Sequence, residues 1–326
     1  MSKPIVLTAI LALAASMTAL AQHRVPIKLP AAEEGQYQHA APTLEHLQTD
    51  ENVHPELRKA ILRGYDLFMN TQQLRGKNVF SDANCSSCHM GEGRMAWSAP
   101  VWASVTTMPD YRGKNWQVNS LEDRIIGCFS FSMNGIPPAY DSDDMLALVA
   151  YHHWLARGAP VYQWNIAGRS FGKVPEPAKK PEYERGGKVF AANCALCHGA
   201  DGQGQYVDGT MQFPSLWGDH SYNWGAGMAR VDTAAAFIKH NMPLGQPGKL
   251  SDQEAWDVAW FISAQERPQD PRFEKSAAYT REKYNNFHSR TLYGTKVNGK
   301  TLGEHSNIGE KPVLKPDALS RQRKFD

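Results

Sequence analysis

The motif Cys85-Ser-Ser-Cys88-His89 recurs downstream as Cys194-Ala-Leu-Cys197-His198. Both copies have the C-x-x-C-H pattern by which haem c is attached to proteins. The two cysteines form thioethers to the haem vinyl groups, and the histidine binds the iron from one face. A C-x-x-C pair alone is equally a thiol redox pair or half of a zinc site, but the added histidine and the recurrence favour haem. The sequence therefore predicts two covalently attached haem c groups, with His89 and His198 as iron ligands.

The sequence around the motifs repeats with them at a spacing of 109 residues. Three pairs of residues keep this spacing: Cys85 with Cys194, Met133 with Met242, and Ser142 with Ser251. Each of the two serines precedes an aspartate and a helical pattern, where serine is a favoured N-cap. Each half thus has a helix, a haem motif, a distal loop and a helix, which resembles a class I cytochrome c domain. We expect an all-α fold of two such domains in tandem, each with one covalent haem c.

A glycine and a phenylalanine precede each motif in the same arrangement. Gly64 and Phe68 lie in a helical pattern that begins at Pro55, and Gly186 and Phe190 lie before the second motif. The apolar residues of the first pattern recur at three- and four-residue steps. We expect each glycine to let its helix cross closely over another helix, because glycine has no side chain there.

The N-terminus has the features of a signal peptide. Lys3 supplies a positive charge, residues 5–15 are apolar, and Ala19-Leu20-Ala21 is a small-x-small cleavage site. The apolar run is short for a bilayer, and no other segment is long and apolar enough, so we expect no membrane span in the mature protein. Covalent haem attachment takes place outside the cytoplasm. We therefore expect a periplasmic protein.

The expected organisation divides the chain into six segments. They are a signal peptide at 1–21, an N-terminal extension at 22–52, a first cytochrome c domain at 53–166, a proline-rich linker at 167–182, a second domain at 183–268 and a basic C-terminal tail at 269–326. We expect the linker to be extended and the tail to be irregular, wrapping a domain. The formal net charge of the chain is only +2, which gives no indication of a nucleic-acid partner.

The distal ligand of the second haem has three candidates. Met242 lies in the sequence His240-Asn-Met-Pro, and Lys239 and His240 are its rivals. Methionine favours Fe(II) and raises the reduction potential, which suits an electron-exit haem, and we favour Met242. We also expect a proline carbonyl to accept a hydrogen bond from Nδ1 of each proximal histidine, with Pro214 a good fit and Pro100 a poorer one.

The distal ligand of the first haem is open between Met133 and Cys128. Met133 is the positional twin of Met242, and Cys128 is the one cysteine of five outside the haem motifs. If Met133 binds the iron, Cys128 is a small buried apolar residue. If the Cys128 thiolate binds it, the anion lowers the potential, which benefits a catalytic site more than an electron carrier.

The run from Leu121 to Pro160 closely resembles the thiosulfate dehydrogenases, or tetrathionate synthases, which are periplasmic di-haem c-type cytochromes. The most specific part is the pattern R-x-x-x-C-F-x-x-S-x-N-G, which begins at Arg124. The resemblance extends over both haem domains. It implies that Cys128 is the distal ligand of the active-site haem, that Arg124 and Ser132 belong to the active site, and that a further basic residue is Arg112 or Lys114. It also implies that the first domain holds this haem and that Met242 serves the second.

The resemblance implies oxidation of two thiosulfates to tetrathionate, or the reverse. Electrons pass through both haems to an external acceptor, a soluble or di-haem cytochrome c. Thiosulfate is a small dianion, so its site needs fixed positive charge and hydrogen-bond donors. Arg124, Arg112, Lys114, Ser132 and Asn134 supply these within one stretch. Two one-electron haems also match a two-electron oxidation.

Two other functions fit parts of the same pattern. A plain di-haem electron carrier would use Met133 as ligand and show no chemistry on thiosulfate. A cytochrome of the sulfur-oxidising complex would transfer thiosulfate to a cysteine of a carrier protein and would need partner subunits. A di-haem peroxidase has no supporting motif.

Overall fold

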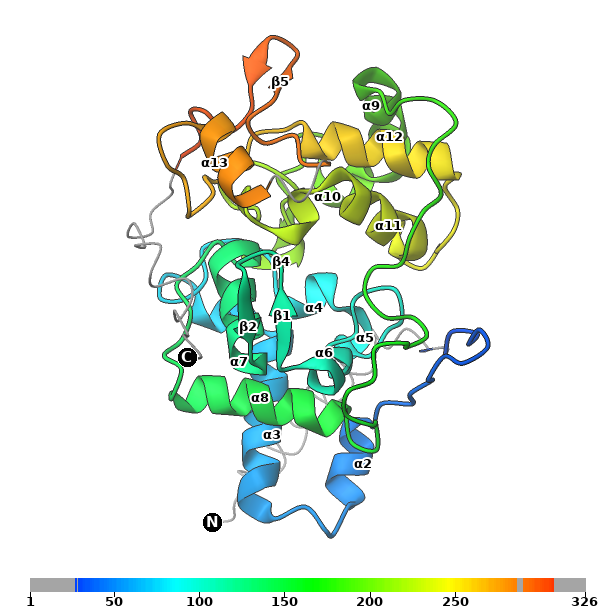
Figure 1. Cartoon of the computed structure of the whole chain (residues 1–326), viewed down its shortest axis with the longest axis vertical. Coiled ribbons are helices and arrows are strands. Elements are labelled where there is room, and N and C mark those ends of the chain that lie inside the picture. The colour runs from blue at the N-terminus through cyan, green and yellow to red at the C-terminus, as the bar shows by residue number, and fades with distance from the viewer. Residues whose placement is uncertain (1–26, 28, 286–289, 308–326) are drawn as a thin grey trace, which may run out of the picture.

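The computed structural model describes residue 27, residues 29–285 and residues 290–307, and the predicted signal peptide lies outside these ranges. Two helical domains lie one above the other in Figure 1. Each domain has its own hydrophobic core, one built from residues 47–166 and the other from residues 190–302. Among the described residues, no helix combines the length and apolar character needed to cross a membrane.

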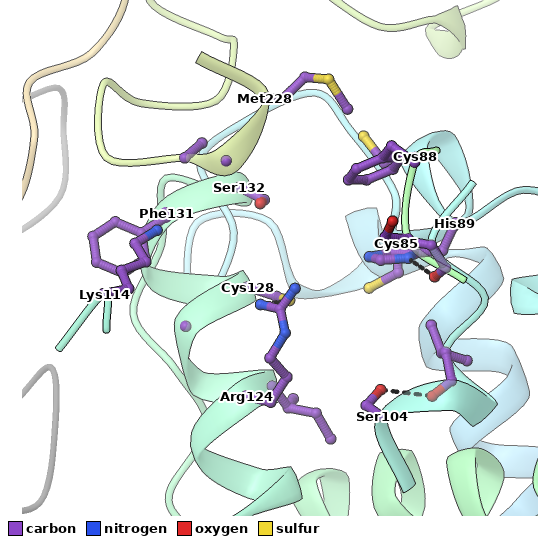
Figure 2. A pocket seen from close by; sticks show the side chains of 18 of the residues that line it. Cys85, Cys88, His89, Ser104, Lys114, Arg124, Cys128, Phe131, Ser132 and Met228 are labelled. Atoms are coloured by element: carbon purple, nitrogen blue, oxygen red, sulfur yellow. Dashed lines mark hydrogen bonds between the residues drawn. The ribbon is translucent and has the colours of Figure 1, made fainter. Parts of the chain in front are cut away.

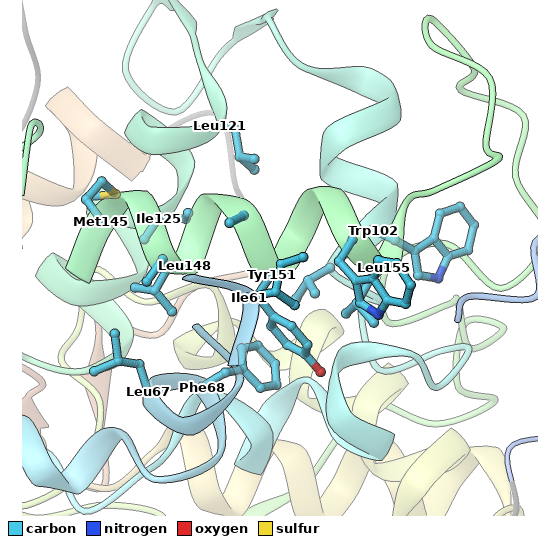
Figure 3. Close-up of a cluster of buried hydrophobic side chains, with 14 of the residues drawn as sticks. Ile61, Leu67, Phe68, Trp102, Leu121, Ile125, Met145, Leu148, Tyr151 and Leu155 are labelled. Carbon is cyan, nitrogen blue, oxygen red and sulfur yellow. The ribbon is translucent and has the colours of Figure 1, made fainter. Parts of the chain in front are cut away.

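The first domain consists of short helices around one crossing helix pair. Its elements are α2 (Leu44–Thr49), α3 (Pro55–Met69), η1 (Thr71–Leu74), α4 (Cys85–Cys88), α5 (Met90–Gly93), α6 (Trp102–Thr107), β1 (Asp110–Arg112), β2 (Gln117–Asn119), α7 (Leu121–Gly127), η2 (Cys128–Ser132) and α8 (Asp143–Leu155). Helices α3 and α8 form the most extensive contact of this domain, and their side chains make the core shown in Figure 3.

Gly64 sets how closely α3 and α8 approach one another. A Cβ atom at this position would lie 2.0 Å from the carbonyl oxygen of Ala147, which no side chain allows. Ile61, Phe68 and Tyr151 fill the space beside the crossing and are almost fully buried (Figure 3). The crossing predicted from the glycine is therefore confirmed, and it brings the end of α3 against the first haem motif.

The second domain repeats this plan. Its elements are α9 (Tyr183–Asn193), α10 (Ala195–His198), β3 (Gln205–Val207), β4 (Thr210–Phe213), η3 (Gly227–Ala229), α11 (Val231–Asn241), α12 (Asp252–Ser263), α13 (Ala277–Asn285), β5 (Lys296–Val297) and β6 (Lys300–Thr301). A Cβ atom on Gly186 of α9 would lie 2.0 Å from the carbonyl oxygen of Asp257 on α12. The two domains therefore use the same glycine-mediated crossing.

The serine N-caps predicted for the last helix of each repeat are present. The Ser142 side chain accepts a hydrogen bond from the backbone N–H of Met145, and Ser251 accepts one from Glu254. The Glu254 carboxylate in turn accepts a hydrogen bond from the backbone N–H of Ser251, which completes a capping box. Both helices therefore begin where the sequence pattern indicated.

The C-terminal segment differs from the irregular tail that we expected. Residues 269–307 contain helix α13 and the hairpin β5–β6. Four of their apolar side chains are buried in the core of the second domain: Ala277, Leu292, Tyr293 and Leu302. The Tyr293 ring packs 5.5 Å from the ring of Trp224. A polar sequence concealed this packing because few, widely spaced apolar residues carry it.

Three short antiparallel hairpins modify the all-α prediction. They are β1–β2, β3–β4 and β5–β6, with two to four residues in each strand. The architecture remains predominantly helical. Residues 172–177 of the linker have no regular secondary structure. The indole N–H of Trp256 donates to the carbonyl oxygen of Pro175 at 2.8 Å, which attaches the linker to α12.

Candidate active site

A cavity of about 490 Å³ lies between the first haem motif and a loop of the second domain. Its walls include Cys85, Cys88 and His89 from the motif and Cys128 from the start of η2. The second domain contributes Met228 from η3. Figure 2 shows these side chains around one open space, with Cys128 across it from Cys85 and His89. The two domains therefore build this site together.

Cys128 begins a π-helix that follows directly on α7. The backbone N–H of Met133 donates to the carbonyl oxygen of Cys128 at 3.0 Å, which is the five-residue spacing of that helix. A single π turn inside a helix is rare and is frequently found at functional sites. Cys128 follows Arg124 by four residues, about one helical turn, so that the two side chains lie on one side of the helix.

The surroundings of Cys128 favour its thiolate. Burial acts to raise the pKa of the thiol, but the charge of Arg124, a hydrogen bond and charge from His89, and the charge of Arg112 together lower this pKa to about 6. Nη1 of Arg124 lies 3.6 Å from the sulfur. By contrast, burial raises the pKa of Cys85, and of its motif partner, to about 12. Cys128 thus has the properties of a reactive or metal-binding cysteine.

The structure separates the two candidates for the further basic residue. Arg112, at the end of β1, is subject to the charges of both Arg124 and Cys128, and burial lowers its pKa to about 10. Lys114 also lines the cavity, but Nζ donates to the carbonyl oxygen of Gly225 at 2.7 Å and lies 3.9 Å from the centre of the Phe131 ring. Arg112 therefore interacts with Cys128 through its charge, whereas Lys114 contacts the second domain.

Ser132 and Met133 line the cavity, and Asn134 does not. Figure 2 shows Ser132 at the end of η2, on the same side of the open space as Cys128. Asn134 is 1% exposed, and its amide oxygen accepts a hydrogen bond from Nδ2 of Asn223 at 3.1 Å. The expectation that Asn134 binds an anion is therefore wrong, because the amide joins the distal loop to the second domain.

The proximal histidines are prepared to bind iron. Nδ1 of His89 lies 2.7 Å from the carbonyl oxygen of Ala99, and Nδ1 of His198 lies 2.9 Å from that of Pro214. Such a bond fixes the ring and leaves Nε2 for the metal. Pro214 is confirmed as the acceptor, but Pro100 is wrong by one residue, because its own carbonyl accepts from Ala103 at the start of α6. These donors, together with the paired cysteines, fit haem c at both motifs.

The rivals of Met242 at the second motif are engaged elsewhere. The ammonium of Lys239 forms an ion pair of 2.8 Å with Asp252. The His240 ring stacks on Trp97 of the first domain, with ring centres 5.3 Å apart. Met242 ends helix α11 and packs against the core of the second domain. Of the three, Met242 is the one for which the described part of the chain shows neither an ion pair nor a ring stack.

Two contributors to the site were missed from the sequence. Met228 lines the cavity from about 100 residues beyond Cys128, and no local motif surrounds it. Arg272, from the C-terminal segment, lies over the face of Phe131 with its guanidinium 4.9 Å from the ring centre. A buried ion pair of 2.7 Å with Asp270 holds this guanidinium. Phe131 thereby contacts a cation from each domain.

Two family models match the chain, one in each domain. Residues 70–161 match the model described as SoxA/TsdA, cytochrome c domain, and residues 183–266 match the model described as Cytochrome c. The two predicted cytochrome c domains are therefore confirmed. The C-terminal segment lies beyond both matches.

The chain is similar to several proteins named thiosulfate dehydrogenase. It is 50% identical to the one from Thiomonas intermedia (strain K12), over 76% of this chain and 78% of the relative. It is 48% identical to the one from Stutzerimonas stutzeri (strain A1501), over 78% and 81%. The solved structure of thiosulfate dehydrogenase (TsdBA) from Marichromatium purpuratum, in its "as isolated" form, matches with a TM-score of 0.75 and 41% identity. This match covers 85% of the present chain and 60% of the solved one. The chain belongs to the thiosulfate dehydrogenase family.

Proposed function

We propose that this protein oxidises two thiosulfate ions to tetrathionate and passes the two electrons through two haem c groups to an external cytochrome c. Membership of the thiosulfate dehydrogenase family supports the substrate and the reaction. The observation that carries the proposal is the environment of Cys128, whose thiol faces His89 across the cavity and lies 3.6 Å from Nη1 of Arg124.

The residues of the two motifs would hold one haem each. The thioether positions are Cys85 and Cys88 in the first motif and Cys194 and Cys197 in the second. The haems supply one-electron acceptors, and their distal ligands make them unequal, because a thiolate stabilises Fe(III) whereas methionine favours Fe(II). With Cys128 at the first site and Met242 at the second, the first haem would have the lower potential and the second would serve as the electron exit. The predicted signal peptide supports export to the periplasm.

Cys128 is the proposed nucleophile. Its thiolate joins the outer sulfur of one thiosulfate, with release of two electrons: Cys-S⁻ + S₂O₃²⁻ → Cys-S-S-SO₃⁻ + 2 e⁻. The second thiosulfate attacks the sulfur that is bound to Sγ, and the bond to Cys128 breaks: Cys-S-S-SO₃⁻ + S₂O₃²⁻ → Cys-S⁻ + S₄O₆²⁻. The second step is an ordinary thiol–disulfide exchange, in which a low pKa makes Cys128 a good leaving group. Both steps run in reverse for tetrathionate reduction.

Arg124 and Arg112 are the proposed anion-binding residues. Two thiosulfate dianions must approach one anionic sulfur, so fixed positive charge has to offset their repulsion. Nη1 of Arg124 lies 3.6 Å from the Cys128 sulfur, Arg112 lines the same cavity, and each guanidinium offers several donors to a sulfonate group. Ser132 adds a hydroxyl donor at the cavity wall. Lys114 also lines the cavity, but its side chain donates to the carbonyl oxygen of Gly225, and burial lowers its pKa well below the usual value.

The direct test is an assay of the purified holoprotein with thiosulfate and an oxidised cytochrome c. We expect one tetrathionate for every two electrons delivered, with sulfate, an anion of equal charge, as the unreactive control. A plain electron carrier would reduce nothing under these conditions. Consumption of thiosulfate without tetrathionate, and only with an added carrier protein, would support the sulfur-oxidising-complex function instead.

A further inference from the structure

The two haem motifs lie in different domains, and the segment that leads into the first motif also contacts the second domain. Asp82, three residues before Cys85, is the centre of this contact. We propose that Asp82 is a positioning residue that holds the two haem sites together and lowers the reduction potential of the second haem. This proposal rests on the proposed function only in assigning one haem to each motif.

Asp82 is a buried carboxylate with partners from both domains. Its residue is 1% exposed, and Oδ1 accepts from Nη1 of Arg75 at 2.8 Å. Oδ2 accepts from the Ser215 hydroxyl of the second domain at 2.7 Å. Burial and the neighbouring Asp82 carboxylate together raise the pKa of Tyr206 to about 12. The backbone N–H of Asp82 donates to the carbonyl oxygen of His220 at 2.7 Å.

The same segment also holds the distal loop of the first haem site. The backbone N–H groups of Phe80 and Ser81 both donate to the carbonyl oxygen of Met133, each at 3.0 Å. Met133 follows directly on η2, which begins with Cys128. The segment 80–82 therefore lies between the distal loop of the first site and the second domain, and it leads directly into the first attachment motif.

On the other side, Asp82 reaches the proximal ligand of the second site through two residues. Ser215 follows Pro214, whose carbonyl oxygen lies 2.9 Å from Nδ1 of His198. The hydrogen bond from Ser215 to Asp82 thus fixes the loop that orients His198. A hydrogen bond of this kind to a metal-binding histidine tunes both the orientation of the ring and the properties of the metal.

Asp82 affects the second haem through its negative charge as well as through its hydrogen bonds. A buried negative charge near an iron favours Fe(III) and so lowers the potential, and the low dielectric of the interior strengthens the effect. Arg75 offsets it only in part, because the Arg75 side chain is 41% exposed and water screens its charge. Asp82 would thereby keep the second haem able to give up its electrons to an external cytochrome, despite its methionine ligand.

The experiment is a spectroelectrochemical titration of the holoprotein, with chemical mediators and without thiosulfate. In Asp82→Asn the amide keeps a hydrogen-bond acceptor for Ser215 but loses the charge. We expect the electron-sharing equilibrium to shift about tenfold toward the second haem, which is about 59 mV for one electron. Ser215→Ala removes the hydrogen bond between the domains and should lower the melting temperature. Because this variant keeps the carboxylate, it should shift the equilibrium between the haems by less than half of the Asp82→Asn shift, on a logarithmic scale.

Asp257→Asn is the matched control. Asp257 is also a buried aspartate, 2% exposed, and its carboxylate is 2.8 Å from Nη2 of Arg185, but it contacts only elements of the second domain. We expect this variant to lose stability without a tenfold shift between the haems. An unchanged equilibrium in Asp82→Asn, or a shift matched by Asp257→Asn, would overturn the proposal. Because no thiosulfate is present, either result is independent of whether the protein oxidises thiosulfate.

Discussion

At the scale of single residues, the site depends on one thiol whose surroundings differ from those of the other cysteines. The charges of Arg124 and Arg112 act against the burial of Cys128 and favour its thiolate. Met133, the rival distal ligand, lines the same cavity but is 3% exposed. Ligation by Cys128 and ligation by Met133 predict opposite results when these residues are replaced.

Replacement of Cys128 by glycine should abolish catalysis while both haems and the fold remain. The nucleophile is lost, so we expect turnover of thiosulfate to fall by roughly a thousandfold or more. The first haem should also gain a higher potential, because the anionic ligand no longer stabilises Fe(III). Met133→Leu is the control and should keep the first haem's spectrum and much of the activity. An inactive Met133→Leu beside an active Cys128→Gly would favour the plain electron carrier.

Replacement of Met242 by alanine should affect the second haem alone. Loss of the sulfur ligand should lower the potential of this haem and slow electron delivery to the acceptor cytochrome, because methionine favours Fe(II). Titration of the two potentials would measure the effect, and Lys239→Gln, which removes a rival ligand without adding a sulfur, should leave them unchanged. If the Lys239 variant moves the potential and the Met242 variant does not, the ligand is misassigned.

At the scale of elements, the helix crossings were predictable and the loops were not. Gly64 and Gly186 each indicated a close crossing, because a glycine has no Cβ atom and lets the backbone of another helix approach closely. The acceptor for His89 was predicted one residue too far along, since the sequence does not reveal that the Pro100 carbonyl already bonds to Ala103. The π-helix at Cys128 likewise has no sequence signature.

The α9–α12 crossing gives a stability prediction with an adjacent control. Gly186→Ala places a methyl group 2.0 Å from the carbonyl oxygen of Asp257, so the helices must move apart. We expect a loss of about 3 kcal/mol in the free energy of unfolding, measured by chemical denaturation. At Gly187 the nearest atom to the added methyl is 3.3 Å away, on the Phe261 ring, and Gly187→Ala should change this free energy by less than about 1 kcal/mol. Equal effects at the two positions would contradict a backbone contact at Gly186.

At the scale of the whole molecule, the two domains and their family could be predicted from the repeat and the motifs, but their joint construction of one site could not. Met228 of the second domain lines the cavity of the first haem. Arg272 of the C-terminal segment contacts the Phe131 ring beside that cavity. Contacts between residues so distant in sequence leave no periodic pattern. The same reason explains why the segment after residue 268 was taken for an irregular tail.

The C-terminal segment should therefore stabilise the second domain. Tyr293 is fully buried, packs on Trp224, and its hydroxyl donates to the side-chain oxygen of Gln269 at 2.6 Å. Tyr293→Ala should lower the free energy of unfolding by about 3 kcal/mol, as expected for a large aromatic side chain removed from a core. Phe273→Ala, at an aromatic residue of the same segment that is 39% exposed, should cost far less. A stability unaffected by Tyr293→Ala would mean that the segment is dispensable.

The proposed function depends most on one bond, that between the Cys128 thiolate and the iron of the first haem. The low-temperature electron paramagnetic resonance spectrum of the ferric holoprotein tests it most directly, because a thiolate-ligated low-spin haem differs clearly from one with histidine and methionine ligands. We predict one signal of each kind, with the thiolate signal lost in Cys128→Gly and retained in Met133→Leu. Two histidine–methionine signals in the unaltered protein would contradict ligation of the first haem by Cys128.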